Sequence, residues 1–196
     1  MNIFIAVPTY ETITPDTFKS IYNMKTGEHK VTFDFVRGYD CARARNIIAK
    51  RTVDEGFDHV LMIDSDIIVP ENALLHMLEH PADVVLGCYP HKNTKKHEVE
   101  LFKLGQPDFV ERFTYDELPV DFPRMSVKGG GMGCALIQAD AFSRLPFPWF
   151  KYVIYNSGSV LSEDLYFCNE ARKAGMKVQG DMRVKCGHMF RHFEYS

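Results

Sequence analysis

The sequence has no apolar run that could cross a bilayer, although 45% of its 196 residues are hydrophobic. A membrane-spanning helix needs about 20 consecutive apolar residues, so we expect no membrane segment. The first residues, MNIFIAVPTY, include no basic leader and read directly as a strand, so we expect no secretory signal. These features favour a cytoplasmic protein with one core, organised as a single domain over residues 1–196.

The sequence also lacks paired cysteines and an excess of positive charge. Its five cysteines are odd in number and form no C-x-x-C pair, which favours reduced thiols and gives a structural zinc site no supporting spacing. The formal net charge is -3, so general binding to nucleic acid is not indicated. No internal repeat or low-complexity linker divides the chain.

In the first half of the sequence, apolar runs alternate with helical patterns. Thr14 and Pro15 are typical of a helix start, Gly56 of a helix end, and Pro70 opens a further helix. The strands between these helices are predicted at residues 2–7, 30–36, 58–66 and 83–89. This alternation predicts an α/β domain with a mostly parallel central sheet flanked by helices.

The second half of the sequence follows a different pattern. A strong helix is predicted to begin at the N-cap Ser162 and to end at Gly175, with acidic residues in its first turn and basic residues in its last. A Gly-rich segment, MSVKGGGMGCALIQADAF, precedes it. Short strands are predicted at residues 99–104, 109–115 and 176–181.

The stretch HVLMIDSDIIVP ends a buried-looking strand in two carboxylates, Asp64 and Asp66. Two carboxylates this close repel each other unless a cation lies beside them. Hard oxygen ligands suit Mg²⁺ or Mn²⁺, which usually bridge to substrate phosphates. The pattern therefore indicates a metal site for a phosphorylated ligand. The alternative is that one aspartate caps the helix at Pro70 and the other is solvated.

Several pieces of the sequence occur in the order found in one family. They are IAVPTY, ARARN, VLMIDSDIIVP, GGGMGCALI, SEDLYFCNEARKAG and KCGHMF. Together they resemble the GT-A glycosyltransferases, particularly the short family-2-like members of bacteria and bacteriophages. The resemblance implies a GT-A-like, Rossmann-like fold with a nucleotide-sugar-binding half at residues 1–90 and an acceptor-binding half at residues 91–196.

The resemblance also implies a set of metal ligands. Asp66 corresponds to the direct ligand of a divalent ion, Mn²⁺ or Mg²⁺, that is held by the donor diphosphate. His188, in the C-terminal CGHMF, corresponds to a further ligand, and Asp64 would lie nearer the ribose or a metal-bound water. A carboxylate and a neutral imidazole make a suitable Mn²⁺ environment. The resemblance implies uridine diphosphate as the nucleotide, because it is the one that the family commonly uses.

The donor-binding residues implied by the resemblance lie in four places. Each place also has a competing structural interpretation: an ordinary strand-to-helix turn, a solvated helix face or a loop entering a strand. Arg43 and Asn46 share a helix face, and the role of Arg45 is left open. The full set is Pro8, Thr9, Tyr10, Arg43, Asn46, Asp64, Ser65, Gly130 and Gly131.

The catalytic and acceptor residues are expected in the second half of the chain. Asp164, with Glu163 beside it, resembles the acidic pair that supplies the catalytic base in inverting members. Acids in the first turn of a helix are also favourable without catalysis. Trp149 and Gly133 are placed at the acceptor site. The alternative for Trp149, the only tryptophan, is a partly buried anchor.

The function expected from these residues is transfer of a sugar from a nucleoside-diphosphate sugar to an acceptor hydroxyl, with inversion favoured. The first alternative is a Mg²⁺-dependent phosphatase like the haloacid dehalogenases, with Asp64 as nucleophile. That family usually has Thr or Val where this chain has Ile68. A nucleotidyltransferase would carry a Gly- and Arg/Lys-rich loop after the first strand. A non-catalytic nucleotide-sugar-binding module is the last alternative.

Overall fold

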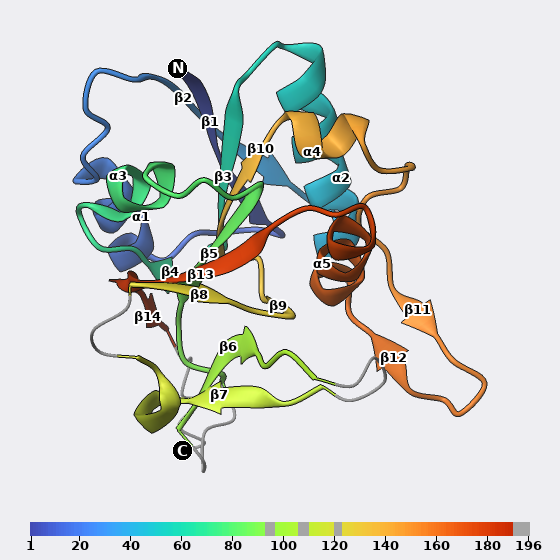
Figure 1. Cartoon of the computed structure of the whole chain (residues 1–196). Coiled ribbons are helices and arrows are strands. Elements are labelled where there is room, and N and C mark those ends of the chain that lie inside the picture. Colours follow the sequence, from blue (N-terminus) through green and yellow to red (C-terminus); the bar gives the residue numbers. More distant parts are fainter. Residues whose placement is uncertain (93–96, 106–109, 120–122, 190–196) are drawn as a thin grey trace, which may run out of the picture.

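The computed structural model describes residues 1–92, 97–105, 110–119 and 123–189. Its centre is a seven-stranded sheet with the strand order β2-β1-β3-β10-β5-β13-β8 (Figure 1). The strands of this sheet are β1 (Asn2–Thr9), β2 (Lys30–Arg37), β3 (His59–Ile63), β5 (Val84–Cys88), β8 (Arg124–Ser126), β10 (Cys134–Gln138) and β13 (Val178–Lys185).

Three small sheets lie beside the central one. They pair β4 (Ile67–Ile68) with β14 (Gly187–His188), β11 (Val153–Ile154) with β12 (Val160–Leu161), and β6 (Glu98–Phe102) with both β7 (Arg112–Thr114) and β9 (Gly129–Gly130). The helices are α1 (Pro15–Tyr22), α2 (Cys41–Asp54), α3 (Ala73–Leu78), α4 (Asp140–Ser143) and α5 (Glu163–Lys173), with a 3-10 turn η1 (Tyr115–Glu117). Phe109, the first residue of one predicted strand, lies outside the described residues.

The predicted α/β class is confirmed, and the central sheet is mixed. Strand β1 runs parallel to β2 and β3, and β5 runs parallel to β13. Strand β10 lies antiparallel between β3 and β5, so it interrupts the parallel order that the alternating pattern predicts. The carboxyl ends of β1, β2, β3 and β5 therefore still meet at one edge of the sheet, where ligands bind in open α/β folds.

The helix ends follow the local signals with two differences. The Thr14 side chain accepts from the backbone N–H of Thr17 at 3.2 Å, and α2 ends before Gly56, whose φ is +71°. Ser162 is the N-cap of α5, as predicted, but its side chain makes no capping hydrogen bond. The helix after Pro70 begins only at α3, three residues later.

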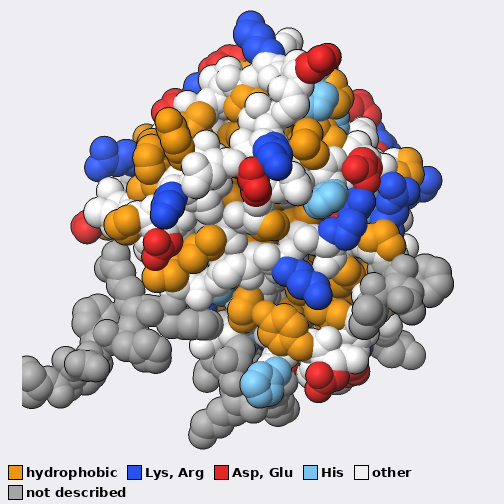
Figure 2. Space-filling view, turned by 90° about the vertical axis from the view of Figure 1, so that its left-hand side faces the viewer, with side chains coloured by type: hydrophobic (Ala, Val, Ile, Leu, Met, Phe, Trp, Pro, Cys, Tyr) orange, Lys and Arg blue, Asp and Glu red, His pale blue; other side chains and the backbone are white. Residues whose placement is uncertain are grey.

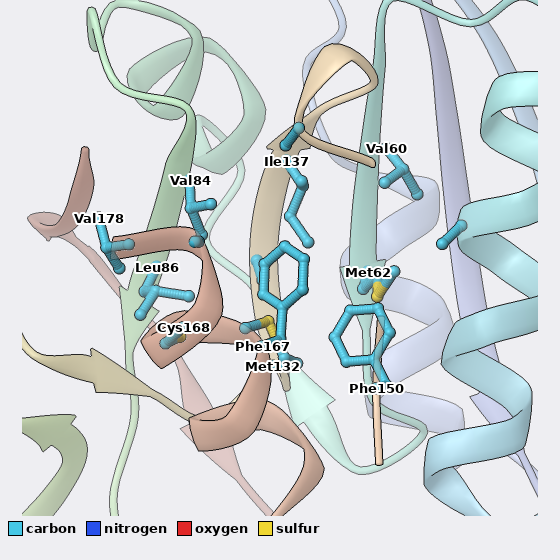
Figure 3. Close-up of a cluster of buried hydrophobic side chains, with 14 of the residues drawn as sticks. Val60, Met62, Val84, Leu86, Met132, Ile137, Phe150, Phe167, Cys168 and Val178 are labelled. Atoms are coloured by element: carbon cyan, nitrogen blue, oxygen red, sulfur yellow. The ribbon is translucent and has the colours of Figure 1, made fainter. Parts of the chain in front are cut away.

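Both faces of the central sheet are covered. Figure 1 shows α1 and α3 on one side and α2, α4 and α5 on the other. Figure 3 shows the second side, where Phe150 and Phe167 pack with strand residues such as Met62. Complete burial of each such side chain stabilises the fold by about 1.5–3 kcal/mol. The surface over α1 and α3 carries charges of both signs (Figure 2).

All five cysteines are unpaired, and only Cys41 is exposed, in agreement with the predicted reduced thiols. Within the described ranges, no helix is long and apolar enough to cross a membrane.

Candidate functional site

A cleft of about 610 Å³ lies at the carboxyl edge of the sheet. It brings together residues that are far apart in the sequence: Asp64 and Asp66 from the turn after β3, Glu163 and Asp164 from the start of α5, and His188 from β14. Its other described lining residues are Cys41, Arg45, Tyr89, His91, Lys92, Glu100, Phe102, Val110, Arg112, Gly131, Val160, Leu161, Ser162 and Leu165.

The two aspartates are held by a tight turn. The backbone N–H of Ile67 donates to the carbonyl of Asp64 at 3.1 Å, and the N–H of Asp64 donates to the carbonyl of Gly133 at 3.0 Å. The carbonyl of Ser65 accepts from the N–H of Thr14, which fixes the start of α1 against the turn. Asp64 and Asp66 therefore reach the cleft from a rigid loop, while Ser65 is not among its lining residues.

Arg45 is the central buried residue of the site, with only 3% of its side chain exposed. Its Nη2 lies 3.0 and 3.1 Å from the two carboxylate oxygens of Asp64, and its Nη1 donates to Glu163. Burial lowers the pKa of the guanidinium, but the neighbouring carboxylates, Asp64 above all, outweigh this and raise it above its usual range. Arg45 therefore stays charged and links the turn after β3 to helix α5.

His188 reaches Asp66 through the short pairing of β14 with β4, in which His188 lies opposite Ile67. The N–H of Met189 donates to the carbonyl of Asp66 at 2.9 Å and fixes this register. His188 Nδ1 lies 2.7 Å from the carbonyl oxygen of Pro90, and its Nε2 lies 3.6 Å from Asp66 Oδ2. Because a carbonyl only accepts, Nδ1 carries the proton, and in the neutral ring the Nε2 lone pair faces Asp66.

The ionisation of this pair follows from its contacts. Burial alone would raise the pKa of Asp66, but hydrogen bonds from the protonated form of His188, whose Nε2 then also carries a proton, and from Lys92 lower it to about 2. Burial would likewise lower the pKa of His188, and its interaction with Asp66 raises it instead. Asp66 is therefore an ionised carboxylate throughout the physiological pH range.

The side chains of the cleft offer two ligands to a divalent ion. Within the part of the chain that the structure describes, no three His, Cys, Asp or Glu side chains form a metal cluster. Asp66 Oδ2 and His188 Nε2 are two suitable ligands, and ions such as Mg²⁺ often take one or two protein ligands and complete their shell with phosphate and water. Both oxygens of Asp64 are engaged by Arg45, so Asp64 is less available as a direct ligand.

The charge of the cleft also fits a divalent cation. Among its described lining residues, five carboxylates face three fixed cations, which leaves two uncompensated negative charges when the histidines are neutral. The residues counted are Asp64, Asp66, Glu100, Glu163 and Asp164 against Arg45, Lys92 and Arg112. Like charges in a shared site favour binding of a counter-ion.

The two acids at the start of α5 have different surroundings. Glu163 is buried and bonded to Arg45 and Tyr152. Burial and the nearby charge of Asp164 raise the pKa of Glu163, against the opposing effect of Arg45. Asp164 is only partly buried, lines the cleft, and accepts from the backbone N–H of Leu165 at 3.1 Å. Of the two, Asp164 is the carboxylate that a ligand in the cleft can reach.

Sequence reasoning missed a group of residues on the opposite wall. Glu100, on β6, accepts from Arg112 Nε at 3.2 Å and is bonded to His91 Nδ1. Tyr89, just after β5, packs edge-to-face on His188 with ring centroids 5.4 Å apart. These residues lie outside the motif pieces, and only the strand predicted at 83–89 gave a signal near Tyr89.

The glycine-rich segment is explained first by packing. A Cβ at Gly131 would lie 2.0 Å from the Tyr89 hydroxyl oxygen, and one at Gly130 would lie 2.5 Å from the carbonyl oxygen of Glu100. The N–H of Gly133 donates to the same hydroxyl at 3.0 Å. Gly131 lines the cleft, whereas Gly130 and Gly133 are buried and are not among the described lining residues.

Some predicted site residues lie away from this cleft. Pro8 and Thr9 end β1, and Tyr10 is largely exposed beyond it. Thr9 lines a separate cavity of about 310 Å³ with Phe35 and Arg37. None of the three is among the described lining residues of the cleft, so their donor contacts stay predictions.

Helix α2 and the loop before β11 hold three more predicted residues. Arg43 stacks on Tyr39, with its guanidinium carbon 4.5 Å from the ring centroid. The Asn46 amide donates to the carbonyls of Ala42 and Phe150 and accepts from the N–H groups of Trp149 and Phe150, so it anchors that loop to α2. Trp149 packs on the core and donates from its indole to the carbonyl of Phe142, as the anchor interpretation predicts.

Comparison with known proteins shows the fold. No protein-family model matches the sequence, and a search of curated proteins found no match. Among solved structures, the chain is similar to A197 from STIV, a viral protein, with a TM-score of 0.66 and 15% identity over 97% of this chain and 87% of that one.

Two glycosyltransferases give further matches. GalNAc-T7, crystallised with UDP, GalNAc and Mn²⁺, has a TM-score of 0.55 and 14% identity over 96% of this chain and 44% of that one. TarS 1-349 of S. aureus has a TM-score of 0.56 and 13% identity over 96% of this chain and 60% of that one. The chain thus spans about half the length of these two structures, and its fold is GT-A-like, which confirms the fold implied by the resemblance.

Proposed function

We propose that this protein is a metal-dependent glycosyltransferase that moves a sugar from a nucleoside-diphosphate sugar to an acceptor hydroxyl. The observation that carries the proposal is the joint presence of Asp66, His188 and Asp164 in one cleft at the carboxyl edge of a GT-A-like sheet. These three come from separate parts of the chain, and each provides a group that the reaction needs. In this proposal, residues 1–90 form the donor side of the cleft and residues 91–196 form the acceptor side.

The donor is assigned to the Asp66 side of the cleft. Asp66 and His188 would hold a Mn²⁺ or Mg²⁺ ion, which supplies charge stabilisation to the leaving diphosphate when bound. Uridine diphosphate is the nucleotide we propose, because both GalNAc-T7 and TarS 1-349 have been crystallised with UDP. The uncompensated negative charge of the cleft supports a metal-bound diphosphate over a free one.

Asp164 is the proposed catalytic base. Its carboxylate takes the proton of the acceptor hydroxyl while the acceptor oxygen forms a bond to the anomeric carbon. The bond between that carbon and the diphosphate oxygen breaks, and the nucleoside diphosphate leaves with the electron pair. A single displacement of this kind inverts the anomeric centre.

Arg45 is proposed as a positioning residue. Its guanidinium holds Asp64 on the donor side and Glu163 on the side of the base. Because Glu163 directly precedes Asp164, the same ion pairs fix the first turn of α5 relative to the turn after β3. Because Arg45 Nη2 engages both carboxylate oxygens of Asp64, the contact also argues against the phosphatase alternative, in which Asp64 needs a free oxygen for nucleophilic attack.

Donor hydrolysis tests this proposal without knowledge of the acceptor, because water can replace the acceptor hydroxyl. The purified protein is incubated with a panel of UDP- and GDP-sugars with Mn²⁺ or with a chelator, and the released nucleoside diphosphate is measured. We expect release from one nucleotide class, dependent on Mn²⁺ and lost in Asp164→Asn. No release from any donor, combined with metal-independent nucleotide binding, would favour the non-catalytic binding module.

A further inference from the structure

Lys92 already holds the oxygen at which a metal ion would bind. Its Nζ lies 2.6 Å from Asp66 Oδ2, the same oxygen that His188 Nε2 approaches at 3.6 Å. The ammonium group and the imidazole therefore converge on one carboxylate oxygen. Lys92 lies four residues after the end of β5 and lines the cleft together with Asp66 and His188.

An ammonium group and a divalent cation compete for such an oxygen. Both are positive and both need the oxygen lone pairs, so a metal ion held by Asp66 and His188 would repel Lys92 and displace it. The displacement is easy because 57% of the Lys92 side chain is exposed, against 27% for Asp66. An exposed ion pair of this kind contributes little free energy and reforms readily.

A lysine displaced in this way would still line the cleft, where the donor diphosphate is expected. A lysine side chain is an unbranched stem that carries a compact charge, and it binds phosphate without a fixed geometry. We propose that Lys92 is a diphosphate-binding residue that occupies Asp66 in the free protein and transfers to the donor when metal and donor bind. This inference rests on the proposed function, which provides the diphosphate.

The exchange has a consequence for binding order. In the free protein Lys92 weakens metal binding at Asp66, and a diphosphate that takes over Lys92 removes this competition. Metal and nucleotide therefore bind with positive coupling, and by linkage each tightens the other by the same factor. Removing the ammonium group should strengthen metal binding in the absence of nucleotide. It should also weaken nucleotide binding and reduce the coupling between metal and nucleotide.

The first test titrates Mn²⁺ alone into the protein, followed by calorimetry or by the electron paramagnetic resonance of free Mn²⁺. Lys92→Met should bind Mn²⁺ about three- to tenfold more tightly than the wild type, as expected for loss of one competing surface ion pair. Lys25→Met is the matched control, because Lys25 pairs with Glu71 at 3.1 Å with side chains 55% and 58% exposed. It should leave the Mn²⁺ affinity unchanged.

The second test titrates UDP into the same variants at saturating Mn²⁺. Lys92→Met should bind UDP about tenfold more weakly, and Lys25→Met should bind it like the wild type. If the wild type binds UDP in a Mn²⁺-dependent way and Lys92→Met changes neither affinity, the inference about Lys92 is wrong and the proposed function stands. If the wild type shows no Mn²⁺-dependent UDP binding, the proposed function fails and takes the inference with it.

Discussion

Arg45 Nη2 lies within 3.1 Å of both carboxylate oxygens of Asp64, in a site where the arginine is almost completely buried. The other terminal nitrogen of the same guanidinium, Nη1, is bonded to Glu163, 118 residues further along the chain. Charged groups are buried in this way only when each has a partner, because an unpaired buried charge is costly. This connection joins the two acidic motifs of the cleft into one rigid unit.

Replacing Arg45 by lysine should impair catalysis more than folding. Lysine keeps the charge but cannot donate to both acids with a planar fork, so the start of α5 loses its fixed position. We expect Mn²⁺-dependent donor hydrolysis to fall about 10- to 100-fold. Arg45→Met should instead lower the free energy of unfolding by about 3–5 kcal/mol, measured by urea denaturation. Arg51→Lys, at a partly buried position of the same helix that pairs with Asp34 and is not among the described lining residues of the cleft, is the control and should preserve activity.

Replacing Asp164 by asparagine should remove the base and preserve the site. We expect donor hydrolysis to fall by about 10²- to 10⁴-fold while the affinity for UDP with Mn²⁺ stays unchanged. Glu170→Gln, a change at a partly buried carboxylate on the same helix that pairs with Lys173 at 2.7 Å, should keep full activity. A full rate in Asp164→Asn would show that another group accepts the proton.

Replacing Gly131 by alanine should disturb the packing of Tyr89. The new Cβ would lie 2.0 Å from the Tyr89 hydroxyl oxygen, and such overpacking costs about 1–3 kcal/mol of the free energy of unfolding. Combining Gly131→Ala with Tyr89→Phe should recover part of this loss, since the clashing oxygen is gone. Gly105→Ala is the control, because nothing lies within 4 Å of a Cβ at that position. Additive effects of the two changes would contradict this explanation.

A second buried carboxylate, Asp181, is not among the described lining residues of the cleft and predicts the response of the fold to acid. Asp181 lies 2.7 Å from His80 Nε2 and accepts from Arg183 at 2.7 Å, and both side chains of the His80–Asp181 pair are fully buried. Burial would raise the pKa of Asp181, but these hydrogen bonds overcome it and hold the pKa below its usual range. A lowered folded-state pKa stabilises the protein above the unfolded value of about 3.9, and this stability is lost as the pH falls below it.

Asp181→Asn should therefore lower the free energy of unfolding by about 3 kcal/mol at pH 7. The difference from the wild type should shrink as the pH falls below about 4, because the wild-type carboxylate is then protonated in the unfolded state. Urea denaturation at several pH values measures this. Asp140→Asn, at a largely exposed position, should show no such difference. If the difference in the free energy of unfolding between Asp181→Asn and the wild type does not change with pH, the lowered pKa of Asp181 is wrong.

Much of the fold was predictable because its signals are local. The Thr14 cap, Gly56 and the apolar strands are each encoded within a few residues, and the structure confirms them. The position of β10 between β3 and β5 was not predictable in this way. Its neighbours in the sheet are set by long-range packing, which a periodic pattern does not encode.

The candidate site divides in the same way. Asp64, Asp66, Glu163, Asp164 and His188 stand out in the sequence, and the structure brings them into one cleft. Helix periodicity favoured Arg43 and Asn46, yet Arg45 is the member of that segment that enters the cleft. The rotation of α2 against the sheet decides which face is buried, and periodicity alone does not give that rotation. Lys92 and Glu100 are absent from the predicted site for a similar reason, since only tertiary packing brings them to it.

The most direct test of the metal-dependent donor site is calorimetric titration of UDP into the wild type, Asp66→Ala and His188→Ala, each with and without Mn²⁺. We expect the wild type to bind UDP in a Mn²⁺-dependent way, and both variants to lose at least about tenfold in affinity. UDP affinity that Mn²⁺ does not change, or that survives in Asp66→Ala, would contradict the metal-dependent donor site.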